Sequence, residues 1–160
     1  MRKSSILCVI MLMVIAGAGC NEKTNKDDTS TAASIETSET SAKVAYDPKR
    51  GEGKFHDVKL DPTLNGSLAL KGEKVSDLKC ISCHKLTDEK LVGPGWKGVT
   101  TRHKPEWIMN FITNTDEMID KDPKAQAMLE LCMVRMPNQN LSDEDARALL
   151  EFMRKNDGLK

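Results

Sequence analysis

The sequence contains few aromatic residues, which occupy 4% of its 160 positions as three phenylalanines, two tryptophans and one tyrosine. Hydrophobic residues make up only 39% of the chain, so its side chains alone offer little apolar surface for burial. A large, flat, apolar bound group would make up this shortfall, because folding depends mainly on apolar surface removed from water. Basic residues are not in excess either, since 24 of them balance 24 acidic ones. This balance argues against a nucleic-acid binder, which would show a strongly basic surface.

A hydrophobic run long enough to cross a membrane is also missing. The apolar run from Ile6 to Ala18 has 13 residues, whereas a spanning helix needs about 20. It follows Arg2 and Lys3 and leads into small residues, which is the pattern of an export signal. Residues 1–19 are therefore predicted to be a signal peptide of an exported protein.

Cys20 directly follows Ala18-Gly19, a sequence that resembles the lipobox of bacterial lipoproteins. The resemblance implies that Cys20 becomes the lipidated first residue of the mature chain, which would hold the protein on the periplasmic side of a bacterial membrane. A free thiol at an exported N-terminus would be a liability in an oxidising compartment, which favours lipidation. Ordinary cleavage that leaves Cys20 as a free thiol, and an uncleaved anchor, are the alternatives.

Residues 20–45 consist mostly of Thr, Ser, Ala, Lys, Glu and Asp. Such a segment has too little apolar surface to offset the entropy of ordering, so it is predicted to be a disordered, lipid-anchored tether. As a flexible coil, ~25 residues span roughly 25–30 Å. Residues 46–66 are expected to lie in an extended conformation against a domain formed by residues 67–160, and the chain has room for one such domain.

The centre of the sequence is Cys80-Ile81-Ser82-Cys83-His84, in which two cysteines are separated by two residues and followed by histidine. This spacing is the attachment signature of c-type haem. A short loop brings both thiols to one edge of the macrocycle, where each adds across a vinyl group, and the adjacent imidazole reaches the iron as proximal ligand. The alternative is half of a zinc site completed by His103 and Cys132, although the sequence lacks a second close pair of ligands.

Helical periodicity and capping residues predict four helices and no strand, which is an all-α domain. Ser67 is the predicted N-cap of the first helix, Pro105 lies in the first turn of the second, Asp122-Pro123 opens the third, and Ser142 caps the fourth. The first helix is expected to end at Lys79.

The first helix has Leu68, Val75 and Leu78 as its predicted apolar positions. It also contains Gly72, which destabilises a helix relative to alanine and therefore predicts a close packing contact at that position.

A proximal histidine leaves one axial position on the iron, and methionine is the candidate for it. Most of the nine methionines fall in the signal peptide or in predicted helices, where core packing is the default role. Met136 stands instead at a helix exit, before Pro137, in a loop that can direct its thioether at the iron. His103 is the competing sixth ligand, and its ordinary role would be that of a solvated loop histidine. Cys132 has no evident partner and is predicted to be a buried, small hydrophobic residue.

From about Ser67 to Asn156, the chain resembles the class I cytochromes c in its order of features: a helix, CxxCH, a Gly-Pro loop, further helices, a Met-Pro loop and an amphipathic final helix. The resemblance implies about four helices around one covalently bound haem, with His84 and Met136 as axial ligands of its iron. It also implies that the carbonyl group of Pro94 accepts a hydrogen bond from the His84 ring.

Two further contacts follow from the same resemblance. The first and last helices of this family cross closely, and Gly72 with Phe152 is the predicted point of contact. A haem propionate is expected to contact one of three residues: Arg102, Trp96 or Trp107.

The function implied by the resemblance is outer-sphere electron transfer by one haem, and the protein is expected not to be an enzyme. His/Met ligation fills both axial positions, so little has to move when the electron arrives. A haem-based gas sensor, or a small haem enzyme, is the alternative, and each of these would need a vacant or labile iron position.

The expected partners are redox proteins of a respiratory chain: a quinol-oxidising complex as donor, and a reductase or oxidase as acceptor. The segments GPGWKGVT, PEWIMNFI and MPNQNLS look most like those of carriers that accompany nitrous oxide reductase, and a terminal oxidase is the alternative acceptor. Residues 79–104 carry six basic and two acidic residues, whereas residues 115–130 carry two basic and five acidic ones. The basic stretch is predicted to surround the haem edge and to steer docking; two ordinary solvated faces are the alternative.

Overall fold

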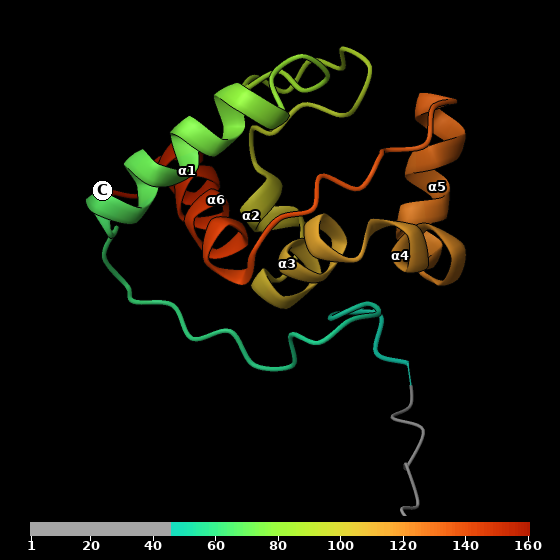
Figure 1. Cartoon of the computed structure of the whole chain (residues 1–160), viewed down its shortest axis with the longest axis horizontal. Helices are drawn as coiled ribbons and strands as arrows, with labels where there is room; N and C mark the ends of the chain where they lie inside the picture. The colour runs from blue at the N-terminus through green and yellow to red at the C-terminus, as the bar shows by residue number, and fades with distance from the viewer. Residues whose placement is uncertain (1–45) are drawn as a thin grey trace, which may run out of the picture. The chain divides into compact units, whose positions relative to one another are not determined.

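In the computed structural model, residues 46–160 are described and form six helices and no strand. The helices are α1 (Gly66–Lys79), α2 (Val99–Arg102), α3 (Pro105–Thr113), α4 (Thr115–Lys121), α5 (Pro123–Cys132) and α6 (Asp143–Asn156), shown in Figure 1. The prediction of an all-α domain is confirmed, although the short helices α2 and α4 are not among the four predicted. The signal peptide, Cys20 and the tether lie outside the described residues. Within residues 46–160, every helix is too short or too polar to cross a membrane.

Side chains that satisfy free backbone N–H groups fix where several helices begin. Asp122 caps α5 and Ser142 caps α6, as predicted, by accepting hydrogen bonds from the first turn. The cap of α1 is Asn65, whose side-chain oxygen accepts a hydrogen bond from Leu68 N at 3.1 Å. The prediction of Ser67 as this cap is wrong, because Ser67 already lies within the first turn of the helix.

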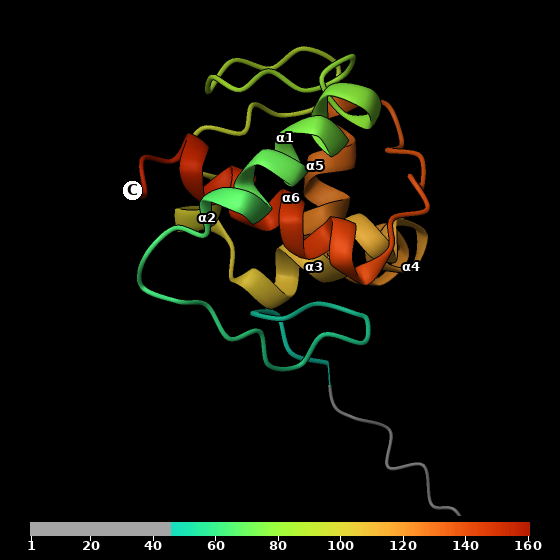
Figure 2. The same cartoon turned by 60° about the vertical axis from the view of Figure 1, so that its left-hand side comes forward.

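The helices α1 and α6 are distant in sequence but pack against each other, as both ribbon views show (Figures 1 and 2). Their contact explains Gly72, since an added Cβ atom there would lie 2.0 Å from the carbonyl oxygen of Ala148. The three atoms closest to that position belong to Ala148 and Leu149, so the predicted partner Phe152 is wrong. Phe152 instead meets Trp96 edge-on, with ring centroids 6.5 Å apart.

The buried face of α1 consists of small residues, namely Ala69, Gly72 and Ser76. Their spacing of three and four residues places them on one side of the helix. The predicted apolar face is wrong at Leu78, which is 84% exposed. The two backbones approach closely because small side chains separate them, and this contact holds the helix that leads into the CxxCH segment.

Residues 46–65 contain neither helix nor strand and lie against the helical domain, where side chains bind their backbone. The fully buried Asn110 of α3 accepts a hydrogen bond from Phe55 N at 2.9 Å and donates to the carbonyl oxygens of Phe55 and Arg50 at 3.0 and 3.1 Å. Gly53 has φ of +147°, and a Cβ atom there would lie 2.4 Å from the Asn110 side-chain oxygen. The segment therefore depends on glycine at this position.

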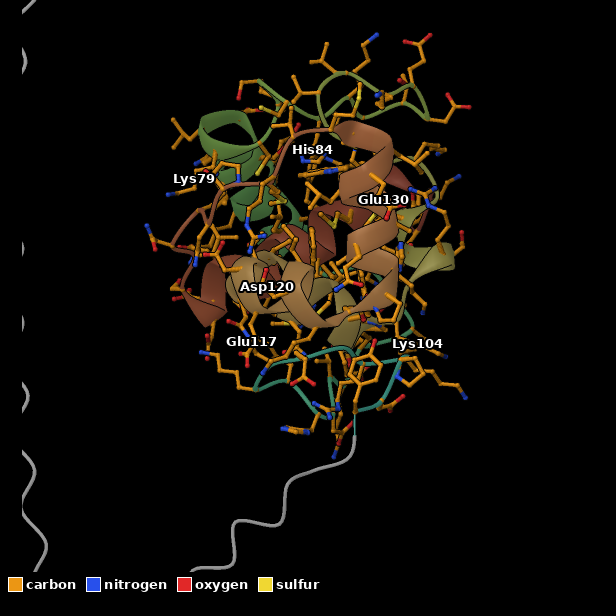
Figure 3. All side chains as sticks on the ribbon, turned by 90° about the vertical axis from the view of Figure 1, so that its right-hand side faces the viewer. Lys79, His84, Lys104, Glu117, Asp120 and Glu130 are labelled. Carbon is orange, nitrogen blue, oxygen red and sulfur yellow. The ribbon has the colours of Figure 1, made fainter. Side chains whose placement is uncertain are left out.

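The described chain begins beside Asp122, which is fully buried and joins three parts of the domain. Its Oδ2 atom accepts hydrogen bonds from the Tyr46 hydroxyl at 2.6 Å and from Trp107 Nε1 at 3.0 Å, while Oδ1 caps α5. Figure 3 shows the N-terminal segment crossing the end of the domain that is farther from His84. The N-terminal segment is thereby fastened at the end opposite to the CxxCH residues.

Candidate functional site

The CxxCH segment forms a tight turn at the end of α1. Cys80 is the C-cap residue of that helix, and its carbonyl oxygen accepts hydrogen bonds from the backbone N–H groups of Cys83 and His84, each at 3.0 Å. Neither cysteine is in a disulfide. Burial raises the pKa of the Cys80 thiol to about 11, with Lys79 opposing the shift, so this thiol is protonated at neutral pH.

The His84 ring is held by the loop that follows. Its Nδ1 atom lies 2.9 Å from the carbonyl oxygen of Pro94, which is the contact implied by the resemblance. A carbonyl oxygen can only accept, so Nδ1 carries the proton and Nε2 keeps a free lone pair. Burial lowers the pKa of His84, against an opposing effect of the Pro94 hydrogen bond, which favours the neutral imidazole that a metal requires.

Gly93 allows this loop to close on the ring. A Cβ atom at Gly93 would lie 2.3 Å from Cε1 of His84 and 2.8 Å from its Nδ1 atom. Gly93 is not among the predicted site residues, although a glycine directly before Pro94 is a signal in the sequence that points to it.

Two hollows lie beside His84, with about 570 and 590 Å³ of empty space that includes space open to solvent. Because they share lining residues, we describe them as the two halves of one cavity. Five residues border both halves: His84, Pro94, Phe111, Met128 and Met136. Of these five, His84, Met128 and Met136 carry side-chain donor atoms for iron, so a flat group that filled the two halves would have these donors near its centre. A further hollow brings Met136 and Pro137 next to Cys80, Cys83 and His84.

The lining of the cavity fits a haem. The lining is mostly apolar, as a porphyrin face requires. It also includes Phe111 and Met128, which are not among the predicted site residues. The helical spacing of Trp107 and Phe111 was visible in the sequence, but periodicity shows only that a residue faces inward and not what it faces.

The other candidate sulfur ligands are placed less favourably. Met133 is 84% exposed and has a left-handed backbone with φ of +57°. Cys132 is half-buried and borders the first half of the cavity, so its predicted role as a buried core residue is only partly right. Within residues 46–160, no three histidine, cysteine or carboxylate side chains gather to hold a metal ion, which removes the zinc alternative with His103 and Cys132.

The residues expected at a haem propionate have different surroundings. Trp96 is buried and borders the second half of the cavity. Arg102 also borders that half and donates hydrogen bonds to the carbonyl oxygens of Lys97 and Gly95. The indole N–H of Trp107 is already bound to Asp122, so it has no hydrogen atom left for a propionate.

A model of the cytochrome c family matches residues 69–157, which is more than half of the chain. The chain belongs to the cytochrome c family. Members of this family carry a covalently attached c-type haem with an iron atom, and the chain is therefore a haem-based electron-transfer protein with the class I cytochrome c fold.

Solved cytochromes c agree with this placement. The cytochrome c from Rhodothermus marinus is 34% identical, with a TM-score of 0.63 over 66% of this chain and 90% of that chain. An engineered form of it is 32% identical, with a TM-score of 0.66 over 69% of this chain and 98% of that chain. A structure of the engineered form bound to a carbene intermediate has 32% identity, the same coverage and a TM-score of 0.63. No curated protein matches the sequence significantly.

Proposed function

We propose that this cytochrome is a single-haem electron carrier of a respiratory chain, with Cys80 and Cys83 as attachment points and His84 and Met136 as axial ligands. The supporting observation is that His84 and Met136 both border the two halves of one apolar cavity beside the CxxCH turn. The iron of the bound haem supplies a centre that alternates between Fe(II) and Fe(III). The chain orients the ligand imidazole through Pro94 and keeps water away from it with apolar side chains.

The alternative functions would need different surroundings. A gas sensor requires a vacant or labile axial position, and a peroxidase-like enzyme also requires acid–base groups beside it. The described lining of both halves contains no carboxylate, and its other histidine, His103, is stacked on Trp107. Met136 borders both halves, which supports it as the occupant of the sixth position. These features favour a carrier.

Exposed apolar side chains lie around the first half of the cavity and form what we call the apolar rim. Val92 and Val134 line the cavity and are nevertheless 39% and 54% exposed. The other members of the rim flank them or Cys132 in the sequence: Leu91, Leu131 and Met133, which are 48%, 72% and 84% exposed. We propose that a redox partner covers this rim in a small, transient interface, which would bring its own centre close to the haem edge.

One lysine borders the hollow beside the CxxCH turn, and another binds the apolar rim. Lys79 donates to the carbonyl oxygen of Gln139 at 3.0 Å, and Lys90 donates to that of Leu131 at 3.1 Å. However, only part of the predicted basic stretch, residues 79–104, lies at the His84 end of the domain. Figure 3 places Lys79 toward the His84 end of the domain and Lys104 toward the opposite end. The proposed steering surface is therefore limited to the lysines near His84.

Electron transfer from the reduced cytochrome to nitrous oxide reductase should be fast and should slow as salt is added. Replacing Lys79 or Lys85 with glutamate should slow it by roughly 3- to 10-fold at low ionic strength, because a charge that attracts the partner becomes one that repels it. Stopped-flow oxidation across ionic strengths measures this effect. The matched control is Lys104→Glu, which makes the same charge change at the other end of the domain and should leave the rate nearly unchanged.

Equal slowing by all three substitutions would contradict docking at the His84 end, and a rate indifferent to salt would contradict steering altogether. The choice of acceptor is tested in parallel. Faster oxidation by a terminal oxidase than by nitrous oxide reductase would make the oxidase the partner and leave the carrier function intact.

We further propose that Cys20 is lipidated and that residues 20–45 tether the domain on the periplasmic side of a bacterial membrane. The support is the Ala18-Gly19-Cys20 sequence after a short apolar run. Cys20→Ser should release the cytochrome from the membrane fraction, while Cys132→Ser, a change of the same chemistry within the domain, should leave it membrane-bound. Fractionation by ultracentrifugation with mass spectrometry of the N-terminus measures this. An N-terminus without lipid would refute the anchor.

A further inference from the structure

His103 occupies a position that neither haem attachment nor iron ligation explains. It follows α2, is half-buried, and borders the second half of the cavity together with Arg102 and Trp96. Its ring stacks on Trp107 with centroids 4.0 Å apart and planes 16° apart. Trp107 is fixed in turn by its hydrogen bond to Asp122. The imidazole is therefore held at the cavity in a defined orientation.

The two ring nitrogens of His103 have different surroundings. Nδ1 is buried and has no hydrogen-bond partner among the described residues. A buried N–H without an acceptor is rarer in proteins than a buried acceptor with an unused lone pair, so the proton belongs on Nε2. The described residues offer Nε2 no acceptor either. The side chain thus presents one N–H donor for which residues 46–160 supply no acceptor.

Burial and the nearby cations keep the His103 imidazole neutral. Burial and the cations of Lys124 and Arg102 lower the pKa of His103 to about 4, against an opposing effect of Asp122. Arg154 and Asp157 face it across a surface hollow that it also borders. At neutral pH the group is therefore a neutral donor next to a cationic guanidinium, and such a pair suits an anionic acceptor.

We propose that Nε2–H of His103 donates a hydrogen bond to a propionate carboxylate of the haem, with Arg102 as the neighbouring positive charge. The cavity contains the haem in the functional protein, and its two propionates are its anionic side groups. Of the three residues expected at a propionate from the sequence, Trp107 is already bound to Asp122, and Arg102 uses part of its donor set on loop carbonyl groups. Trp96 also borders this half of the cavity, so His103 and Trp96 can each serve a propionate. His103 is thus a positioning residue for haem and not an iron ligand.

The test compares midpoint potentials of haem-loaded variants across pH. His103→Phe keeps a ring to stack on Trp107 but removes the donor. An ionised propionate that loses its hydrogen bond has its negative charge less compensated, which stabilises Fe(III), so the midpoint potential should shift downward. The pH-dependent step of the potential should shift to higher pH, because the carboxylate binds its proton more readily. His103→Gln, which restores an N–H donor, should reverse both shifts in large part.

The matched control is His56→Phe, the same change at an exposed histidine outside the cavity, which should shift neither quantity. An unchanged potential and pH profile in His103→Phe would overturn the proposal, and so would a shift that His103→Gln does not reverse. If His103→Phe fails to take up haem, nitrogen-15 NMR of the wild-type haem protein decides instead. A slowly exchanging Nε2–H on His103 supports the proposal, and exchange as fast as that of His56 contradicts it.

Discussion

Replacing Met136 with alanine should lower the midpoint potential of the haem by on the order of 0.1 V, within the roughly 0.8 V range over which axial ligands set haem potentials. As an axial ligand, the thioether of Met136 would stabilise Fe(II) relative to stronger donors, so its loss should favour the oxidised state. The weak near-infrared absorption of sulfur-to-iron coordination should also disappear from the oxidised protein. Redox titration and a near-infrared spectrum of the haem-loaded variant measure these two effects.

Two other methionines provide controls for this substitution. Met128 borders both halves of the cavity as Met136 does, but it projects from α5. Met133 is three residues from Met136 and is exposed. Met128→Ala should shift the potential only slightly through changed packing, and Met133→Ala should not shift it. Loss of the near-infrared band in either control, with the band retained in Met136→Ala, would show that the ligand has been assigned to the wrong residue.

Gly72→Val should destabilise the domain by roughly 3 kcal/mol or more, the upper range for single substitutions that overpack a core. The added Cβ atom would lie 2.0 Å from the Ala148 carbonyl oxygen, and a backbone atom cannot move aside as a flexible side chain can. Relief of the clash would require α1 and α6 to separate. Urea unfolding of the haem-loaded protein, followed by circular dichroism, measures the loss.

Gly66→Ala is the matched control in the same helix, because nothing lies within 4 Å of a Cβ atom at that position. Alanine favours helix over glycine, so this variant should be unchanged or more stable by up to about 1 kcal/mol. If Gly72→Val unfolded at the same urea concentration as wild type, the close contact between α1 and α6 would be wrong.

Local chemistry made some parts of the structure predictable from the sequence. Some features are set by residues that are close together in the sequence, and such features can be predicted from the sequence. They are the CxxCH spacing, the Met-Pro loop and the helix caps Asp122 and Ser142. The resemblance that these features carry also implied the contact between His84 and Pro94, which the structure contains.

The contact of α1 with α6 shows why other parts were less predictable. Large apolar side chains in the sequence predict Leu78 on the buried face of α1, whereas that face consists of Ala69, Gly72 and Ser76. Small residues form this face because the distance between the helices is set by a distant segment, α6, and periodicity within α1 cannot reveal it. The short helices α2 and α4 likewise depend on tertiary contacts more than on their own propensity.

Charge along the sequence was also a poor guide to charge in space. Lys79 and Lys104 belong to one basic stretch, yet they lie toward opposite ends of the domain in Figure 3. Trp107 was one of three residues expected to contact a haem propionate, but its indole N–H donates instead to the buried carboxylate of Asp122. Both outcomes depend on which segments the fold brings together.

The proposed electron carrier requires an iron whose two axial positions are filled by His84 and Met136. The most direct measurement is the absorption spectrum of the reduced, haem-loaded wild-type protein at neutral pH, with and without carbon monoxide. A six-coordinate carrier predicts the same spectrum in both samples, because Met136 leaves no position for the gas. Rapid conversion to the carbon monoxide complex would contradict the account and favour a gas sensor or an enzyme with a labile sixth ligand.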